Sequence, residues 1–312
     1  PEDYGVIALI VVFIAISQVF VQSGFGTALI QKKEVTDEDY SSVFYLSLGI
    51  ALIFYCLLFL GAPAIAAFYD QPLITPVLRV MGLTLFFGAV NTIQNAVIAR
   101  NFQFRKLFIS SLGAVLLSGV VGVVMAYAGY GVWALVGQQL TSIIALCAIM
   151  WLTVKWRPRL LFSLTRVKEL FSFGWKLLVS GLIGVTYNNL SSLIIGKLYP
   201  ASMLGYYTKG QSFPHLLMSN IDSSIQAVML PAYSQKQDNR PQIKEIMRRA
   251  LVTSSFLVFP AMAGLAAVAE PLVILLLTEK WLVAVPFLQI FCAVYALWPI
   301  HTANLQAINA LG

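Results

Sequence analysis

The stretch from Tyr4 to Ile30, "YGVIALIVVFIAISQVFVQSGFGTALI", contains no charged residue. An α-helix needs about 20 predominantly apolar residues to cross the hydrocarbon core of a bilayer. A helix that is apolar on every side is typical of a membrane span or the core of a large protein. This stretch therefore indicates a transmembrane helix, and the rest of the chain repeats its pattern.

The composition of the whole chain agrees with this interpretation. Of 312 residues, 59% are hydrophobic and 11% are charged, whereas an ordinary soluble domain has about 25% charged residues. Nine segments are long and apolar enough to span a membrane, and the connections between them leave no room for a soluble catalytic domain. We expect an all-α, polytopic membrane protein and no enzyme. The nine segments run roughly from Tyr4 to Ile30, Tyr40 to Phe68, Leu73 to Ala99, Leu107 to Tyr127, Gly131 to Val154, Leu170 to Lys197, Leu204 to Leu230, Ala250 to Leu277 and Leu282 to Ala310.

The three cysteines, Cys56, Cys147 and Cys292, lie far apart in apolar runs. Their spacing matches neither a zinc site nor a disulfide framework. No cofactor or metal is predicted. The chain begins without Met and stops inside an apolar pattern, so we expect a fragment that is truncated at both ends.

The basic residues predict the orientation in the membrane, because Lys and Arg accumulate in cytoplasmic loops. Alternate connections hold fifteen of the 20 Lys and Arg residues, and the other connections hold almost none. The net charge of +7 is thus a topology signal, and nucleic acid is not a predicted partner. The fifteen residues are Lys32, Lys33, Arg100, Arg105, Lys106, Lys155, Arg157, Arg159, Arg166, Lys168, Lys236, Arg240, Lys244, Arg248 and Arg249.

A weak internal repeat runs through the chain. "GFGTALIQKK" at Gly24 returns as "IQAVMLPAYSQK" at Ile225, and "FYDQPLITPVLRVMGLTLFFGAVNTIQNAVIA" at Phe68 returns as "LTEKWLVAVPFLQIFCAVYALWPIHTANLQAINA" at Leu277. Six spans separate equivalent points, so both halves enter the membrane in the same direction. Such parallel repeats occur in transporters that bind their substrate between two lobes. We expect two helical bundles: an N-terminal lobe at residues 1–157 and a C-terminal lobe at residues 158–312.

Several motifs resemble those of the Wzx-type flippases of the polysaccharide transporter family, within the multidrug, oligosaccharidyl-lipid and polysaccharide exporter superfamily. They are "PEDYGVIALI", "GFGTALIQKKE", "AVIARNFQFRKL", "GYGVWALVGQQL" and "FGWKLLVSGLIGVTYNNLSSLIIGKLY". The resemblance covers essentially the whole chain, which would correspond to helices two to ten of the family. It implies that undecaprenyl-pyrophosphate-linked oligosaccharide is flipped across the bacterial inner membrane by alternating access. The implied partners are this glycan, membrane lipid, and a polysaccharide polymerase or other pathway proteins.

Polar residues form a strip along "KGQSFPHLLMSNIDSSIQ", Lys209 to Gln226. One central charge facing lipid costs about 2.5 to 3.5 kcal/mol, so we expect the strip to face water. At 100° per residue, five of its residues fall within about 80°, with Lys209 about 60° beyond them. These five residues are Ser212, His215, Ser219, Asp222 and Gln226.

A second strip lies on the preceding span, where Lys176, Ser180, Tyr187 and Ser191 fall within about 80°. The repeat adds Gln18 and Gln22 of the first span. With the family's substrate in mind, we predict one cavity between the lobes. Its Ser, Gln and Tyr side chains would bind sugar hydroxyls, and its lysines would bind the pyrophosphate as mobile point charges.

Alternatives stay open for the ionisable residues. Lys176 and Lys209 lie close enough to the ends of their spans to extend toward the interface, and Lys209 could also pair with a residue of the missing first helix. Asp222 and His215 are seven residues apart and could form a proton-coupling pair. The alternative for Asp222 and His215 is an internal hydrogen-bonding cluster. Arg79 is interpreted as an interfacial anchor.

The segment "TDED", Thr36 to Asp39, superficially resembles the acidic metal site of sugar-nucleotide transferases. Because it directly precedes a span, and helix N-termini favour Thr caps and acidic first turns, we predict a helix cap. Gln138 and Gln139 are interpreted as helix-packing contacts.

Two other functions compete with the flippase. A cation-coupled multidrug antiporter of the same superfamily should have an apolar cavity with buried acids, whereas Lys176 and Lys209 favour an anionic head group. A membrane-embedded sugar ligase or polymerase needs a large periplasmic loop with catalytic Arg or His. Every connection that is poor in basic residues is short, which argues against the ligase or polymerase.

Overall fold

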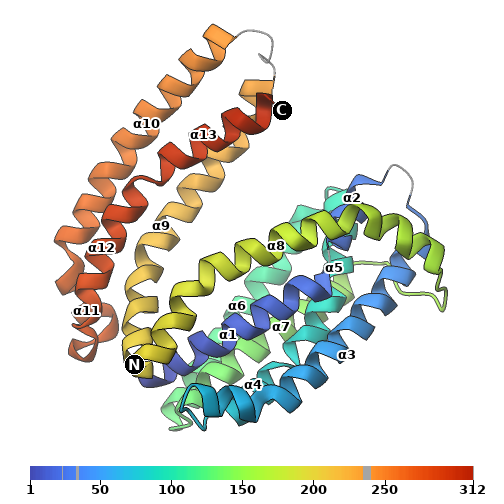
Figure 1. The fold of residues 1–312 in the computed structure, drawn as a ribbon, viewed down its shortest axis with the longest axis horizontal. Coiled ribbons are helices and arrows are strands. Elements are labelled where there is room, and N and C mark those ends of the chain that lie inside the picture. The colour runs from blue at the N-terminus through green and yellow to red at the C-terminus, as the bar shows by residue number, and fades with distance from the viewer. Residues whose placement is uncertain (23, 33–34, 235–239, 312) are drawn as a thin grey trace. The chain divides into compact units, whose positions relative to one another are not determined.

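The computed structural model describes residues 1–22, 24–32, 35–234 and 240–311 (Figure 1). The described residues form helices joined by short connections and no β-strand, which confirms the predicted all-α class. The helices are α1 (Glu2–Gln22), α2 (Phe25–Gln31), α3 (Asp37–Phe68), α4 (Ile74–Met81), α5 (Thr84–Arg100), α6 (Phe104–Tyr127), α7 (Val132–Thr153), α8 (Leu164–Leu198), α9 (Ala201–Ser234), α10 (Arg240–Ala267), α11 (Ala269–Leu277), the short 3₁₀-helix η1 (Glu279–Trp281), α12 (Ala284–Ala296) and α13 (Trp298–Leu311).

Eight candidate membrane spans are found among the described residues, where the sequence predicts about nine. The predicted stretch from Leu204 to Leu230 lies in α9 and is not among the eight. Its lysine, aspartate, asparagine and serine residues lower its hydropathy, which is the same feature that makes it a polar strip. The eight spans are Glu2–Ile30, Asp37–Phe68, Ile74–Arg100, Phe104–Tyr127, Val132–Thr153, Gly174–Leu198, Pro241–Ala267 and Ala284–Leu305.

Four of the predicted spans are each divided into two helices. The first is divided before α2, where Gly24 has φ +67°. A Cβ atom at Gly24 would also lie 2.6 Å from the carbonyl oxygen of Gly174 on α8. Only glycine meets both demands, since it adopts positive φ at no steric cost and lets two backbones approach. The other three divisions fall between α4 and α5, between α10 and α11, and between α12 and α13.

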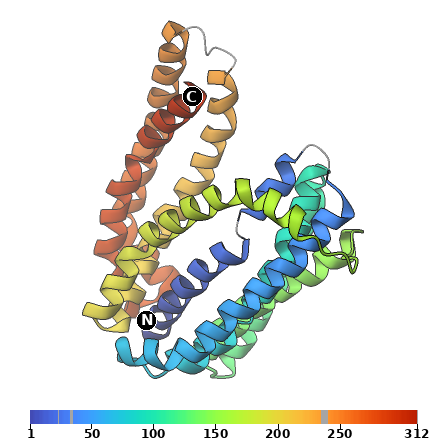
Figure 2. The same ribbon diagram turned by 45° about the vertical axis from the view of Figure 1, so that its right-hand side comes forward.

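The chain divides into two compact units. The first, which we call the α1–α8 unit, spans Glu2–Ala201, and the second, the α9–α13 unit, spans Ser202–Gly312 together with Pro1. Helix α8 belongs to the first unit because it packs against α1, α2 and α3. The internal repeat instead places a lobe boundary at residues 157 and 158, and these lobes remain a prediction. Within the α9–α13 unit, α10 lies beside α12 and α13 (Figure 2).

A buried carboxylate, Asp39, organises one end of the α1–α8 unit. Its side chain is fully buried, and Lys32 donates to Oδ1 at 2.9 Å. The second oxygen, Oδ2, accepts from the backbone N–H of Thr36 at 2.9 Å, and the backbone N–H of Asp39 donates to Thr36 Oγ1. This reciprocal capping box confirms the helix cap predicted at "TDED".

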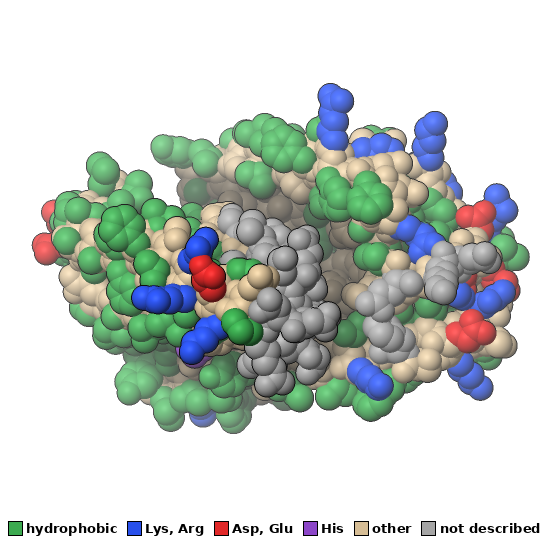
Figure 3. Space-filling model, turned by 90° about the horizontal axis from the view of Figure 1, so that it is seen from above, with side chains coloured by type: hydrophobic (Ala, Val, Ile, Leu, Met, Phe, Trp, Pro, Cys, Tyr) green, Lys and Arg blue, Asp and Glu red, His purple; other side chains and the backbone are tan. Residues whose placement is uncertain are grey.

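Further contacts fasten the connection between α7 and α8 to the start of α3. The backbone N–H groups of Arg159 and Ser163 donate to the hydroxyls of Ser41 and Ser42. Arg159 also pairs with Asp37 at 3.2 Å. These contacts place the basic residues before α3 and before α8 at one end of the unit, where Figure 3 shows Lys and Arg side chains among Asp and Glu. Lys236, which the charge pattern assigns to the same side of the membrane, lies outside the described residues.

Arg79 on α4 compensates for a proline, Pro63, in the C-terminal part of α3. Pro63 has no N–H, so the carbonyl of Phe59, four residues earlier, receives no helical hydrogen bond from it. The Arg79 Nε donates to that carbonyl at 3.2 Å, and the guanidinium lies 4.3 Å from the Phe59 ring centroid. An unsatisfied carbonyl is costly in a membrane. Arg79 therefore has a specific partner in addition to the interfacial position predicted for it.

We predict that Asp39→Asn destabilises the full-length protein by about 3 kcal/mol, because removing one member of a buried ion pair leaves the other uncompensated. In thermal unfolding in detergent, this should lower the midpoint by about 5–10 °C. Glu38→Gln is the matched control, since Glu38 is only partly buried and Arg166, with which it pairs, is 3.9 Å away. Equal midpoints for the two variants would show that Asp39 does not organise this end of the unit.

A double-mutant cycle tests the pairing of Arg79 with the Phe59 carbonyl. Arg79→Met should cost about 1 kcal/mol in the natural background, the value of one hydrogen bond. In a Pro63→Ala background, the restored N–H satisfies the carbonyl, so the same substitution should cost much less. Thermal unfolding of the four proteins gives the coupling energy. A coupling energy near zero would contradict this explanation.

Candidate functional site

The α1–α8 unit contains a polar cavity of about 470 Å³. Helices α1, α5 and α7 form its walls, and no charged side chain lines it. Gln18 and Gln22, which the repeat predicts to line a substrate cavity, are both part of the wall. The polar lining residues are Gln18, Gln22, Asn91, Thr92, Asn95, Gln139 and Ser142.

Close packing of α1 against α5 brings the cavity residues together. The Gln18 side chain lies directly against Gly88, where a Cβ atom would be 2.1 Å from the Gln18 Nε2. The Thr92 hydroxyl donates to the Gly88 carbonyl at 2.9 Å, as is common for Thr inside helices. Asn91 is buried, and its Oδ1 has no hydrogen-bond partner among the described residues. The cavity therefore holds amide groups available to a ligand or to water.

The sequence prediction missed most of the α5 and α7 contribution. It interprets Gln139 as a packing contact, and it assigns no role to Asn91, Asn95 or Ser142. The signal was present, because Gly88, Asn91 and Asn95 recur at intervals of three and four within an apolar span, as do Gln139, Ser142 and Leu146. This spacing puts each set on one helical face, but a single helix does not reveal which faces meet.

The predicted residues of α8 lie elsewhere in the same unit. Lys176, Ser180 and Tyr187 are exposed on the α1–α8 unit, and Tyr187 is 78% exposed. None of the three lines the polar cavity. Their predicted contact with a substrate therefore remains a prediction.

In the α9–α13 unit, α9 has the two faces that its sequence predicts. Pro214 and Met218 are buried, and a Cβ atom at Gly210 would meet the α12 backbone at 2.9 Å. On the predicted polar strip, Ser212 and His215 are exposed, and Lys209 and Asp222 are partly buried. Ser212 donates to the carbonyl of Lys209 at 2.8 Å. The side chain of Gln226 lies outside the described residues.

Asp222 and His215 contact different neighbours in the α9–α13 unit. The Thr302 hydroxyl donates to Asp222 Oδ1. The His215 ring packs edge-on against Tyr295 and Trp298, with centroids 5.8 and 6.4 Å apart. These contacts support the internal cluster that the sequence leaves open as an alternative. A proton-coupling role, and a cavity shared by both units, remain predictions.

A family model described as polysaccharide biosynthesis protein matches residues 1–286. The chain is 25% identical to the succinoglycan biosynthesis transport protein ExoT of Rhizobium meliloti, over 92% of this chain and 58% of ExoT. It is 24% identical to the teichuronic acid biosynthesis protein TuaB of Bacillus subtilis, over 95% of this chain and 62% of TuaB. It is also 24% identical to the lipopolysaccharide biosynthesis protein WzxC of Escherichia coli, over 94% of this chain and 60% of WzxC.

Among solved structures, the fold is similar to that of the lipid II flippase MurJ in its inward closed conformation. The TM-score is 0.77 at 17% sequence identity, and the match covers 99% of this chain and 70% of MurJ. The candidate spans and these bacterial relatives identify a multi-pass protein of the bacterial inner membrane. The chain spans about 60% of the length of the curated relatives it matches. Because the family model matches nearly the whole chain, the chain belongs to the polysaccharide biosynthesis protein family.

Proposed function

We propose that the complete protein is a flippase, not an enzyme, and that it moves a lipid-linked oligosaccharide from the cytoplasmic to the periplasmic leaflet for surface polysaccharide biosynthesis. The family membership supports a role in that pathway, and the names of ExoT and MurJ describe transport and flipping. The observation that carries the proposal is the uncharged, amide-lined cavity of the α1–α8 unit.

The chemistry of this cavity fits a sugar. Side-chain amides donate and accept hydrogen bonds, so they match hydroxyl groups, which do both. A volume of about 470 Å³ lies within the usual range for ligand pockets. Polar side chains within membrane spans are costly unless they meet water or a polar partner. Three amides lie on α1 and α7, namely Gln18, Gln22 and Gln139. We therefore propose that they bind a polar substrate and are not merely helix-packing contacts.

The anionic part of the substrate needs other residues. We propose that Lys176 and Lys209 bind the pyrophosphate of an undecaprenyl-pyrophosphate-linked glycan, with Ser180, Tyr187 and Ser212 as hydrogen-bonding neighbours. Lysine suits this role because its ammonium group is a compact charge on a flexible stem. Asp222 and His215 are proposed to link transport to an ion. A polysaccharide polymerase would then receive the flipped unit.

The cavity disfavours the multidrug antiporter. A lipophilic cation would need an apolar, aromatic wall and a carboxylate, and the wall of this cavity has neither an acidic nor an aromatic side chain. Binding a cation there would leave its charge buried without a partner, which is strongly unfavourable. The sugar interpretation leaves no such charge in the cavity.

A matched pair of substitutions on α7 tests the cavity. In the full-length protein, Gln139→Ala should reduce polysaccharide export about fivefold, since one lost hydrogen bond is worth about 1 kcal/mol. Gln138→Ala is the control because Gln138 is its exposed neighbour and does not line the cavity. The measurement is polymer at the surface of cells that lack their own copy of the gene, at matched protein abundance. Equal export by both variants would exclude this cavity as the sugar site.

A second set of substitutions tests the charge at Lys209. Lys209→Ala should reduce export at least tenfold while the protein stays inserted, because a pyrophosphate would lose a partner in a low-dielectric environment. Lys209→Arg should keep part of the activity, since it keeps the charge. Lys280→Ala, a substitution of an exposed lysine in the same unit, should have no effect. Full export by Lys209→Ala would assign the residue to anchoring at the interface.

A further inference from the structure

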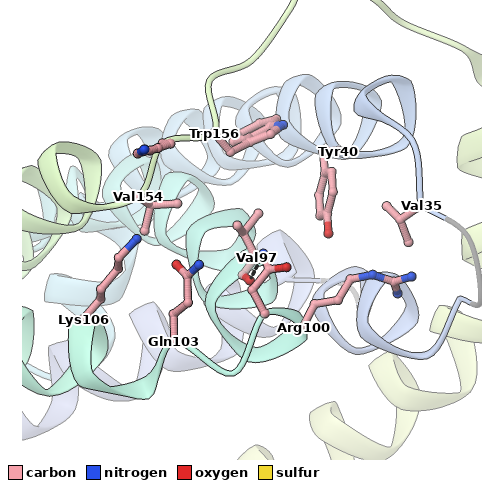
Figure 4. A pocket seen from close by; sticks show the side chains of 10 residues that line it. Val35, Tyr40, Val97, Arg100, Gln103, Lys106, Val154 and Trp156 are labelled. Carbon is pink, nitrogen blue, oxygen red and sulfur yellow. Dashed lines mark hydrogen bonds between the residues drawn. The ribbon is translucent and has the colours of Figure 1, made fainter.

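A second pocket, of about 570 Å³, opens at the basic end of the α1–α8 unit. It lies between the start of α3, the connection from α5 to α6 and the connection from α7 to α8. Figure 4 shows the Tyr40 hydroxyl, the Gln103 amide and the Lys106 ammonium directed toward one space. This pocket shares no lining residue with the amide-lined cavity.

The pocket is strongly basic. Arg100, Lys106 and Lys155 line it, and none of its lining residues is acidic. Neither Lys106 nor Lys155 forms an ion pair within the described part of the chain, whereas Lys32, Arg159 and Arg166 at the same end are paired with carboxylates. Two cations are thus left to attract an anion that is not part of the protein.

Arg100 adds a charge whose position is fixed. Its guanidinium donates to the carbonyls of Leu29 and Ile30 at 3.2 and 3.3 Å, at the end of α2. These contacts hold the guanidinium at the C-terminal end of α2, where the helix dipole favours a cation. Beside the pocket, the buried Nε1 of Trp156 has no hydrogen-bond partner among the described residues.

The surroundings of the pocket indicate a membrane lipid. Phe102, in the α5–α6 connection, is 83% exposed and has φ +53°, a backbone conformation that is unusual for a bulky residue. Its ring lies 6.3 Å from that of Phe104, which is 54% exposed. Exposed Phe rings beside basic residues are typical of segments that lie at a membrane surface, where the rings enter the acyl chains and the basic groups meet the head groups.

We propose that this pocket binds the phosphate of an anionic phospholipid from the cytoplasmic leaflet. Lys106 and Lys155 pair with the phosphate, Arg100 provides a fixed charge at the side, and Tyr40 donates a hydrogen bond. The rings of Phe102 and Phe104 lie against the acyl chains. The site is separate from the proposed sugar cavity, and the proposal does not depend on transport.

The proposal predicts selective lipid binding by the purified full-length protein. In native mass spectrometry with added lipid, phosphatidylglycerol should bind at least tenfold more tightly than phosphatidylcholine. The double variant Lys106→Gln/Lys155→Gln should lose about tenfold of that affinity, since each basic residue near an anionic surface contributes substantially. The control Arg105→Gln/Lys168→Gln removes two charges from exposed residues at the same end and should bind like the natural protein.

The arms of this experiment separate the possible anions. Inorganic phosphate at 20 mM should fail to displace phosphatidylglycerol, and displacement would identify a site for free phosphate instead. Competition by a polyprenyl pyrophosphate would assign the pocket to the transported substrate and overturn the proposal. Equal lipid affinity of the pocket variant and the control, with unchanged thermal unfolding midpoints, would also overturn it.

Discussion

The buried carboxylate of Asp39 is the constraint on which one end of the α1–α8 unit depends. In a membrane, lipid is as apolar as leucine, so apolar side chains alone do not drive helices together. Polar links therefore fix which helices meet. Asp39 receives Lys32 from the end of α2 and caps α3 through Thr36, while Arg166 of α8 approaches to 3.9 Å. Next to it, the contacts of Arg159 and Ser163 with the start of α3 position the α7–α8 connection, which forms one wall of the basic pocket.

Within the membrane spans, close approach of helix backbones holds α1 against α8 and α5. A Cβ atom at Gly196 of α8 would be 2.4 Å from the Leu9 side chain of α1, so these helices pack as small-residue interfaces do in membranes. On its other side, α1 presses Gln18 against Gly88 of α5. The amide-lined cavity results from this packing. Ion pairs thus gather at one end of the unit, and uncharged amides line the cavity between α1, α5 and α7.

The sequence predicted the features that are encoded within one helix. The apolar helices, the cap at Thr36 and the two faces of α9 follow from local composition and from the helical period, and the structure has them. Helix α9 is present but is too polar to count as a candidate span. The partnership of Arg79 with the carbonyl left free by Pro63 depends on two helices packing together, and no local pattern encodes it. The amides of α5 and α7 were missed for the same reason. The internal repeat pointed to Gln18 by a long-range relation that its own helix lacks, but it predicted a cavity between two lobes, and a role of Gln18 in substrate binding remains a prediction.

The separation of charge from amide groups limits what the α1–α8 cavity can do. Its wall holds no cation, so the pyrophosphate of a lipid-linked sugar could not enter it without an uncompensated charge. Under the proposed function, the sugar and the pyrophosphate are bound by different residues. Lys176 is exposed on α8, and Lys209 lies on α9, so both lie outside this cavity, and the proposal assigns the pyrophosphate to them. Under the proposed function, the amide cavity selects the glycan, while the lysines retain the anionic group that every substrate of this class would share.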